Sequence, residues 1–216
     1  ELKTPITSIG GYIETAQGDI PPETKNKFFE KAIAQNFRLN SIIDDLLRLS
    51  RIEAIQDEET FTLSNQKLLP VIEGSVEDIR ETIKKYNAKV IVNCANEIYA
   101  DIDSQLFREA IINLIENAIK YSDVNPEVIL NIKENTENIY IDVKNTGSVI
   151  PEKERNKIFN RFYRIDKSRS KKTGGTGLGL AIVKHISIVH NGNIWVNKSD
   201  KKSTVFRFTL PKNIVN

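Results

Sequence analysis

The 216-residue sequence contains no methionine, one cysteine and one tryptophan. The single Cys94 excludes a disulfide framework, and its position at the end of the apolar run Val90–Cys94 favours a small buried residue over a reactive thiol. A formal net charge of +2 is too small to argue for nucleic acid or a membrane surface, so we expect neither as a partner. No apolar run has the length of a membrane span, and no signal peptide is visible. Because the first residue is not methionine, we expect the chain to be a portion of a longer protein.

The first 55 residues have helical periodicity. Apolar Leu2, Ile6, Ile9 and Ile13 form one helical stripe, and Gly18 with the prolines after it predicts a turn. In the helix that follows, seven residues occupy heptad a and d positions: Phe28, Ala32, Gln35, Leu39, Ile42, Leu46 and Leu49. Since a lone hairpin cannot bury two such stripes, we predict that residues 1–55 dimerise as a four-helix bundle.

The composition changes after residue 55. Residues 56–65 are rich in Glu, Asp, Thr and Ser and are interpreted as a linker, and residues 66–216 as a second domain. There the periodicity predicts helices over 69–87 and 103–121 and a helix that begins after the glycines near 177 and ends near 191. It predicts strands over 89–94, 98–100, 128–133, 138–144, 193–197 and 204–210. This order indicates an α+β fold: a helical hairpin followed by a two-layer α/β sandwich with mostly antiparallel strands.

A glycine-rich stretch, residues 173–183, reads TGGTGLGLAIV. Glycines before the start of a helix predict an anion site, because unpaired N–H groups and the helix dipole face the same point. The alternative is a flexible surface loop before a packed helix. The stretch is not a P-loop, because no Gly-Lys-Ser/Thr ends it.

A second polar pattern lies in the predicted helix over 103–121. Asn113, Asn117 and Lys120 are spaced i, i+4 and i+7 and therefore share one face. A carboxamide oxygen suits Mg²⁺, which usually bridges substrate phosphates, and a lysine adds positive charge for those phosphates. The alternative is an ordinary solvated face.

Together with Leu2-Lys3-Thr4-Pro5 and Ile158–Arg164, these two stretches resemble the catalytic core of bacterial sensor histidine kinases. The four motifs cover nearly the whole chain in the family's order. The resemblance implies a phosphoacceptor hairpin, an ATP-binding domain of the histidine kinase, Hsp90 and gyrase type, and Mg-ATP as the bound nucleotide. It also implies a homodimer, a response regulator receiver domain as partner, and the cytoplasmic portion of a membrane-anchored sensor.

The resemblance also implies site residues. Asn117 would coordinate Mg²⁺, and Arg164 would approach the γ-phosphate. Phe159 and Phe162 would support the lid over the nucleotide, which is hinged on the glycines. The implied nucleotide contacts are Asn113, Asn117, Lys120, Tyr121, Asn145, Gly147, Ile150, Phe159, Phe162, Gly175, Thr176, Gly177, Leu178 and Gly179.

The sequence departs from the family at the adenine-binding stretch. The usual Asp-x-Gly-x-Gly is Asn145-Thr146-Gly147-Ser148-Val149 here. Asn145 can accept a hydrogen bond from adenine without charge assistance, so we expect weaker binding rather than none. Val149 narrows the backbone conformations available to that loop.

A second departure concerns the phosphoacceptor. In the family a histidine directly precedes the run that begins here at Glu1, so the chain as printed should not autophosphorylate at that site. Glu1 suits a general base or orienting group for that histidine. In the family, the residue three positions after this glutamate positions water for dephosphorylation of the regulator, and the resemblance implies that role for Thr4. His185 and His190 follow the glycine stretch, and we expect them to face solvent or packing neighbours.

Two other functions stay open. A hydrolytic ATPase of the same superfamily would carry a glutamate where Asn113 stands. A non-catalytic dimeric nucleotide-binding scaffold is suggested by the absent histidine together with Asn145 and Val149.

Overall fold

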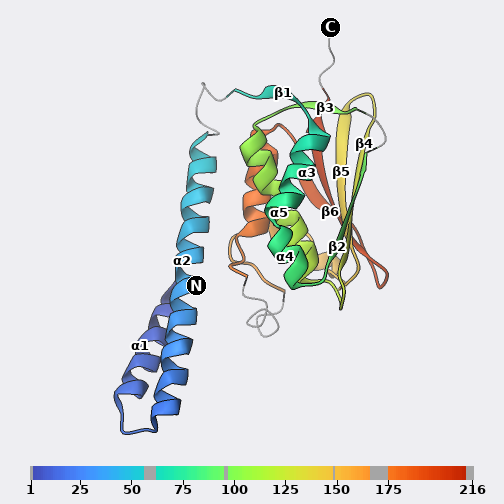
Figure 1. Cartoon of the computed structure of the whole chain (residues 1–216). Helices are drawn as coiled ribbons and strands as arrows, with labels where there is room; N and C mark the ends of the chain where they lie inside the picture. Colours follow the sequence, from blue (N-terminus) through green and yellow to red (C-terminus); the bar gives the residue numbers. More distant parts are fainter. Residues whose placement is uncertain (1, 56–61, 95–96, 148, 166–174, 213–216) are drawn as a thin grey trace.

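A computed structural model describes residues 2–55, 62–94, 97–147, 149–165 and 175–212. A helical hairpin stands beside an α/β sandwich (Figure 1). The hairpin consists of α1, Lys3–Gln17, and α2, Pro22–Ile55. At 1.5 Å per residue α2 is about 50 Å long, so it runs well past the end of α1.

The two halves of α2 pack against different neighbours. Its first half pairs with α1, where the aromatic rings of Tyr12 and Phe28 lie 6.1 Å apart. In its second half Ile42, Leu49 and Ile52 are buried in the same cluster as the sandwich core. The predicted heptad stripe is therefore real, but its second half covers the sandwich rather than the inside of a hairpin bundle.

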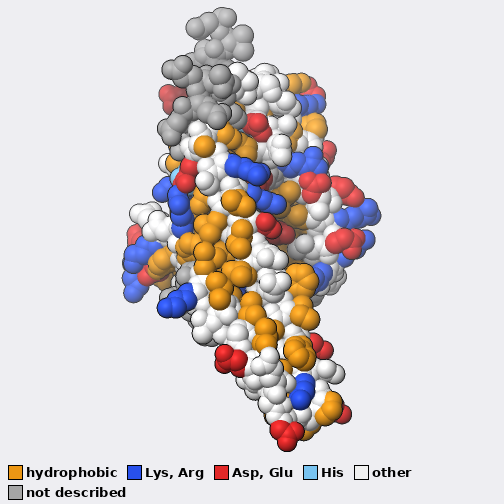
Figure 2. Space-filling model, turned by 90° about the vertical axis from the view of Figure 1, so that its left-hand side faces the viewer, with side chains coloured by type: hydrophobic (Ala, Val, Ile, Leu, Met, Phe, Trp, Pro, Cys, Tyr) orange, Lys and Arg blue, Asp and Glu red, His pale blue; other side chains and the backbone are white. Residues whose placement is uncertain are grey.

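The buried face of α1 differs from the predicted stripe. Pro5 and Ala16 are buried, whereas Leu2, Ile6 and Ile13 are exposed. Large apolar side chains of α2 are exposed too, and Figure 2 shows hydrophobic side chains gathered along the hairpin. We call this set the apolar hairpin surface: Leu2, Ile6, Ile13, Phe29, Ile33, Phe37, Ile43 and Leu47.

The sandwich contains a five-stranded sheet in the order β2-β4-β5-β7-β6. Its strands are β2 Lys89–Cys94, β4 Glu127–Glu134, β5 Asn138–Asn145, β6 Asn193–Ser199 and β7 Thr204–Pro211. The β2–β4 pair is parallel and the other pairs are antiparallel. A separate antiparallel pair joins β1, Ser64–Lys67, to β3, Tyr99–Ile102. The strand β1 was not predicted, because its sequence Ser-Asn-Gln-Lys has no apolar alternation.

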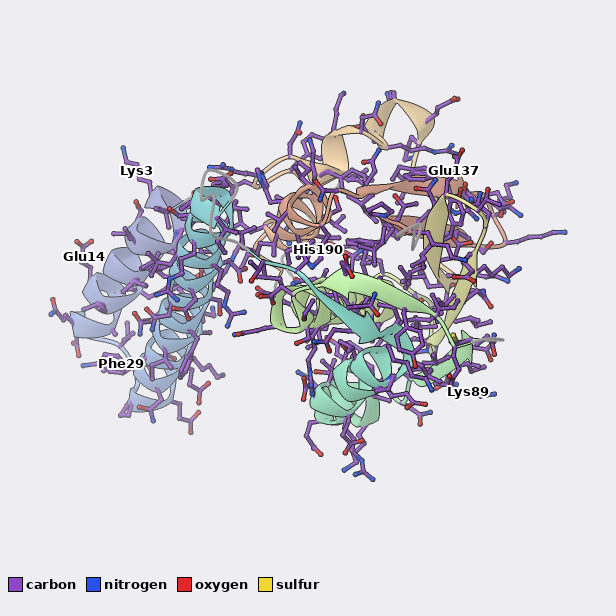
Figure 3. The ribbon with its side chains drawn as sticks, turned by 90° about the horizontal axis from the view of Figure 1, so that it is seen from above. Lys3, Glu14, Phe29, Lys89, Glu137 and His190 are labelled. Carbon is purple, nitrogen blue, oxygen red and sulfur yellow. The ribbon has the colours of Figure 1, made fainter. Side chains whose placement is uncertain are left out.

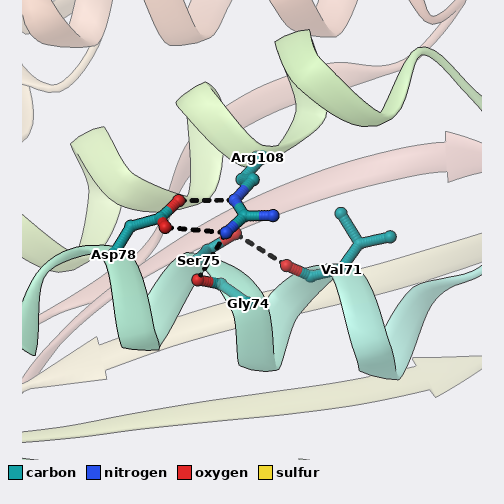
Figure 4. Close-up of polar contacts among 5 residues, drawn as sticks. All are labelled: Val71, Gly74, Ser75, Asp78 and Arg108. Atoms are coloured by element: carbon teal, nitrogen blue, oxygen red, sulfur yellow. Dashed lines mark hydrogen bonds and ion pairs between the residues drawn. The ribbon is translucent and has the colours of Figure 1, made fainter.

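Helices cover one face of this sheet (Figure 1). They are α3 Leu68–Asp78, α4 Arg80–Lys85, α5 Ser104–Lys120 and α7 Gly179–Val189, with short 3₁₀ turns η1 Glu152–Glu154 and η2 Lys157–Phe159 before α7. The single helix predicted over 69–87 is broken at Ile79, so α3 and α4 are separate. The Arg108 guanidinium of α5 holds α3 through Asp78 and the Gly74 carbonyl (Figure 4).

The core contains a buried histidine. His190 is fully buried inside the sandwich, as the view from above shows (Figure 3). The Asp103 N–H donates to its Nε2 at 3.1 Å, and its Nδ1 lies 2.7 Å from the Ile186 carbonyl oxygen. Because a carbonyl only accepts, the proton resides on Nδ1 and the ring is neutral. Both nitrogens are occupied, so His190 has the packing role that we expected.

Candidate nucleotide-binding site

A cleft of about 1210 Å³ opens between α2, α5, α7 and the ends of β5 and β7. This volume exceeds what most small-molecule ligands occupy. Both polar motifs of the sequence line it. Predicted site residues in its lining are Asn113, Asn117, Lys120, Tyr121, Asn145, Ile150, Arg164, Gly175, Thr176, Gly177 and Gly179.

Helix α5 supplies one wall of the cleft. Its N-terminus is capped by Asp103, whose carboxylate accepts from the Leu106 N–H at 2.8 Å. Ile111, Ile115 and Ala118 are buried on the core side, as predicted, which turns the polar face toward the cleft. The sequence interpretation of two separate faces is therefore confirmed.

The polar side chains of α5 are partly held by their own helix. Asn113 Nδ2 donates to the Glu109 carbonyl at 3.0 Å, and Lys120 Nζ pairs with Glu116 Oε2 at 2.7 Å. Asn117 lines the cleft between them, one helical turn from each. No group of three or more His, Cys, Asp or Glu suited to a metal occurs in the described part of the chain. The Asn117 amide could offer one oxygen to a Mg²⁺ whose other ligands include phosphates and water, which is how Mg²⁺ is commonly held.

The glycine stretch enters α7 against Asn113. A Cβ on Gly179 would lie 2.7 Å from Asn113 Oδ1, so only glycine fits there without a shift. Gly177 has φ +80°, and its carbonyl accepts from the Phe162 N–H at 2.9 Å. Leu178 is fully buried and anchors the loop between these glycines. The described end of the loop is thus held by Phe162 at Gly177 and lies against Asn113 at Gly179. The N-terminus of α7, which follows directly, faces the cleft.

The predicted aromatic pair occupies two environments. Phe159 is buried, with its ring edge-on to Phe206 at 6.3 Å between centroids. Phe162 is half-buried with φ +60° and is tied to Gly177. Arg164 lines the cleft, and a Cβ on Gly177 would lie 3.4 Å from its Cγ. Phe162 and Arg164 therefore contact the described end of the glycine loop at Gly177.

Contacts from α2 to the glycine loop were not predicted. Thr176 Oγ1 donates to Asp45 Oδ2 at 2.7 Å and also accepts from the Leu178 N–H at 3.2 Å. Burial raises the pKa of Asp45, and the hydrogen bond from Thr176 acts in the opposite direction. This bond connects the hairpin to the loop across 131 positions of sequence, and no local pattern in the sequence indicates it.

A second unpredicted link joins the end of α2 to α7. Glu53 pairs with Arg161 and lies 3.2 Å from His185 Nε2. Burial lowers the pKa of His185, while the Glu53 carboxylate opposes that shift. His185 therefore contacts a charged partner from the hairpin, so it is neither freely solvated nor part of the core.

The far end of the cleft is built around Asn145. The residue is 4% exposed, and its Nδ2 donates to Ser122 Oγ at 3.0 Å and to the Thr146 carbonyl at 3.2 Å. Gly147 bridges to Ser122, and a Cβ on it would lie 2.1 Å from the Tyr121 carbonyl oxygen. Tyr121 itself is partly exposed at the end of α5.

The cleft wall continues after Asn145. Val149, which stands where the family has a glycine, lines the cleft. The Ile150 N–H donates to Ser199 Oγ at 2.8 Å, which fixes the next residue of the cleft wall.

The hairpin residues of the predicted site lie elsewhere. Glu1 is outside the described residues. Thr4 is exposed on the first turn of α1 and does not line the cleft. Among the described helices, none is long and apolar enough to span a membrane.

Two family models match this chain. Residues 102–214 match the model of histidine kinase-, DNA gyrase B- and HSP90-like ATPases, and residues 1–55 match the phosphoacceptor domain of histidine kinases, His Kinase A. The sensor histidine kinase WalK of Bacillus subtilis is 35% identical over 98% of this chain. WalK of Staphylococcus aureus is 34% identical over the whole chain. The chain spans 35% of the length of the first of these relatives and 52% of the second.

Solved structures agree with the fold. The catalytic domain of histidine kinase ThkA aligns with 70% of this chain and 99% of its own, with a TM-score of 0.61 and 28% identity. ThkA in complex with the response regulator protein TrrA aligns with 98% of this chain and 59% of that chain, with a TM-score of 0.77 and 26% identity. The chain therefore belongs to the family of histidine kinase-, DNA gyrase B- and HSP90-like ATPases, and it is the catalytic core of a bacterial sensor histidine kinase.

Proposed function

We propose that this core transfers the γ-phosphoryl group of Mg-ATP to a histidine directly before Glu1. The phosphoryl group then passes to an aspartate of a response regulator, which the same core also dephosphorylates. The observation that carries this proposal is the shared cleft, in which Asn113, Asn117 and Lys120 face the glycine loop at the N-terminus of α7. Phosphoryl transfer depends mainly on positioning and charge neutralisation, and this cleft supplies both.

Each wall has a defined task in this proposal. The N-terminal amides of α7 and the Lys120 ammonium would hold phosphate oxygens, and Arg164, which also lines the cleft, would approach the γ-phosphate. Asn117 is the protein ligand of Mg²⁺, which would neutralise charge on those phosphates. At the other end the Asn145 amide oxygen would accept from the adenine amino group, with Tyr121 and Ile150 of the cleft lining beside the base. Gly147, which bridges to Ser122, is the further nucleotide contact that we propose there.

Position 113 favours transfer over hydrolysis. The Asn113 amide donates to the Glu109 carbonyl and cannot accept a proton from water as a carboxylate would. Hydrolysis would need a base at this point of the cleft. We therefore infer that ATP turnover by this core depends on a histidine acceptor.

The hairpin would supply the acceptor and the dimer contact. We propose that residues 1–55 form the dimerisation and phosphoacceptor unit, 56–65 the linker, and 66–216 the ATP-binding domain. The apolar hairpin surface supports dimerisation, because large apolar side chains on a helix favour burial against a partner. Glu1 would act on the histidine as base or orienting group, and Thr4 would position water during dephosphorylation.

The partner and location follow from the relatives. The complex of ThkA with TrrA supports a response regulator receiver domain as partner. Because the relatives are sensor kinases of which this chain spans only a part, we propose that it is the cytoplasmic portion of a membrane-anchored sensor.

Labelling with [γ-³²P]ATP tests the proposal. A chain extended by one histidine before Glu1 should gain acid-labile phosphate, whereas the same chain carrying Asn117→Ala, or alanine in place of that histidine, should not. Steady phosphate release without labelling would instead indicate a hydrolytic ATPase. Nucleotide binding with neither labelling nor release would indicate a scaffold.

A further inference from the structure

An asparagine at position 145 can recognise a base in two ways, whereas an aspartate there could recognise it in only one. A carboxylate presents only acceptors to the cleft, whereas a carboxamide has one accepting end and one donating end. Which end faces the base decides whether the site reads an amino group or a carbonyl at purine position 6. This inference rests on the proposed function, because it takes the Asn145 end of the cleft as the base site.

A chain of hydrogen bonds fixes the orientation of this amide. Ser122 Oγ donates to the Ala118 carbonyl at 2.7 Å, so its lone pairs are left to accept. Asn145 Nδ2 donates to that Oγ at 3.0 Å, and its second hydrogen is directed to the Thr146 carbonyl at 3.2 Å. Because both carbonyls only accept, the chain has a single direction. Asn145 Oδ1 is then the end that remains for a ligand.

The Ser122 backbone is held independently of its hydroxyl. Ser122 pairs with Gly147 in an isolated antiparallel bridge. A Cβ on Gly147 would lie 2.9 Å from Ser122 Cα, which shows how closely the two backbones approach. Removing the Ser122 hydroxyl therefore changes the polarity around Asn145 while the backbone stays in place.

We propose that Ser122 is a specificity-determining residue, which locks the Asn145 amide so that the site selects the 6-amino group of adenine and rejects a 6-carbonyl purine. With the lock in place, a carbonyl at position 6 would face Oδ1, and two acceptors would oppose each other. Without the Ser122 acceptor, only the longer hydrogen bond to the Thr146 carbonyl holds the Asn145 amide in this orientation. The amide can then turn and donate to the carbonyl of hypoxanthine or guanine.

Calorimetric titration with Mg-ADP and Mg-IDP tests this proposal, since the inosine nucleotide differs from adenosine only around position 6. The 216-residue chain should prefer ADP. In Ser122→Ala the ratio of the two affinities should fall by about three- to tenfold, the range that one neutral hydrogen bond typically contributes. Ser75→Ala is the matched control, because Ser75 also donates to a carbonyl four residues earlier, at 2.9 Å, but lies on α3 outside the cleft (Figure 4). Its ratio should stay at the wild-type value.

A rescue variant separates polarity from packing. In Ser122→Ala/Asn145→Asp the carboxylate has no donor to turn toward IDP, so the preference for ADP should return. An unchanged ratio in Ser122→Ala, or equal losses for ADP and IDP without rescue, would overturn the proposal. If the wild-type chain binds neither nucleotide, the proposed function fails and the base-selection proposal fails with it.

Discussion

The side-chain oxygen of Asn113 occupies the space that any side chain at position 179 would need, because a Cβ there would lie 2.7 Å away. Asn113 on α5 and Gly179 at the start of α7 both line the cleft, on the two walls that we assign to the phosphates. The short distance to Asn113 explains why α7 begins with a glycine, although other residues have a higher helix propensity.

Gly179→Ala should therefore weaken Mg-ADP binding by about tenfold or more, because either Asn113 or the N-terminus of α7 has to move. The measurement is calorimetric titration of the 216-residue chain. Adding Asn113→Ala to Gly179→Ala removes the clash, so the two substitutions should be strongly non-additive. Gly11→Ala is the control, since nothing lies within 4 Å of its added Cβ and the site is distant in sequence on α1. Additive losses of binding free energy from the two site variants would show that positions 113 and 179 do not interact in this way.

The apolar hairpin surface predicts a second outcome. Phe37 is 68% exposed on α2, so Phe37→Glu should leave the fold of one chain intact but place a charge in the dimer contact. Analytical ultracentrifugation should show a dimer for the wild-type chain and a monomer for the variant at micromolar concentration. Asn36→Glu adds the same charge at the neighbouring exposed position and should remain dimeric. A dimer that survives Phe37→Glu would move the contact to another surface.

Much of this arrangement could be predicted from the sequence because it is local. Asn113, Asn117 and Lys120 belong to one helix, so their spacing alone brings them to one wall. The prediction of mostly antiparallel strands is confirmed, because only the β2–β4 pair of the described sheet is parallel. That one parallel pair could not be predicted, because strand direction depends on the intervening elements and leaves no periodic signal. The hydrogen bond between Thr176 and Asp45 could not be predicted either. No sequence pattern indicates it, because the two residues meet only through the packing of α2 on the sandwich.

His190 predicts a pH dependence of stability. Burial lowers the pKa of its imidazole, although its bond to the Ile186 carbonyl opposes the shift. The pKa of a histidine in an unfolded chain is about 6.5. Below that pH the unfolded chain therefore binds more protons than the folded one, and the free energy of unfolding falls until the pH reaches the folded pKa. The loss is at most about 1.4 kcal/mol per pH unit for one proton.

Urea denaturation at pH 7.5 and 6.0 measures this effect. His190→Gln cannot titrate, so its free energy of unfolding should be lower at pH 7.5 yet change less between the two pH values than that of the wild type. Asp45, Glu109 and His185 titrate in both proteins, so their contributions cancel in the comparison. Equal pH dependence in the two proteins would mean that His190 is not held neutral by the fold.

The most direct measurement of the proposed site is the Mg²⁺ dependence of ADP binding to the 216-residue chain and to its Asn117→Ala variant. If Asn117 holds the ion between α5 and the phosphates, Mg²⁺ should tighten ADP binding to the wild type. The variant should retain metal-free binding and lose most of that gain. Asn131→Ala, which changes an asparagine of β4 that bonds to Asn93 outside the cleft, should keep the full Mg²⁺ effect. A full Mg²⁺ effect in Asn117→Ala would contradict the assignment of this face of α5 as the Mg-ATP site.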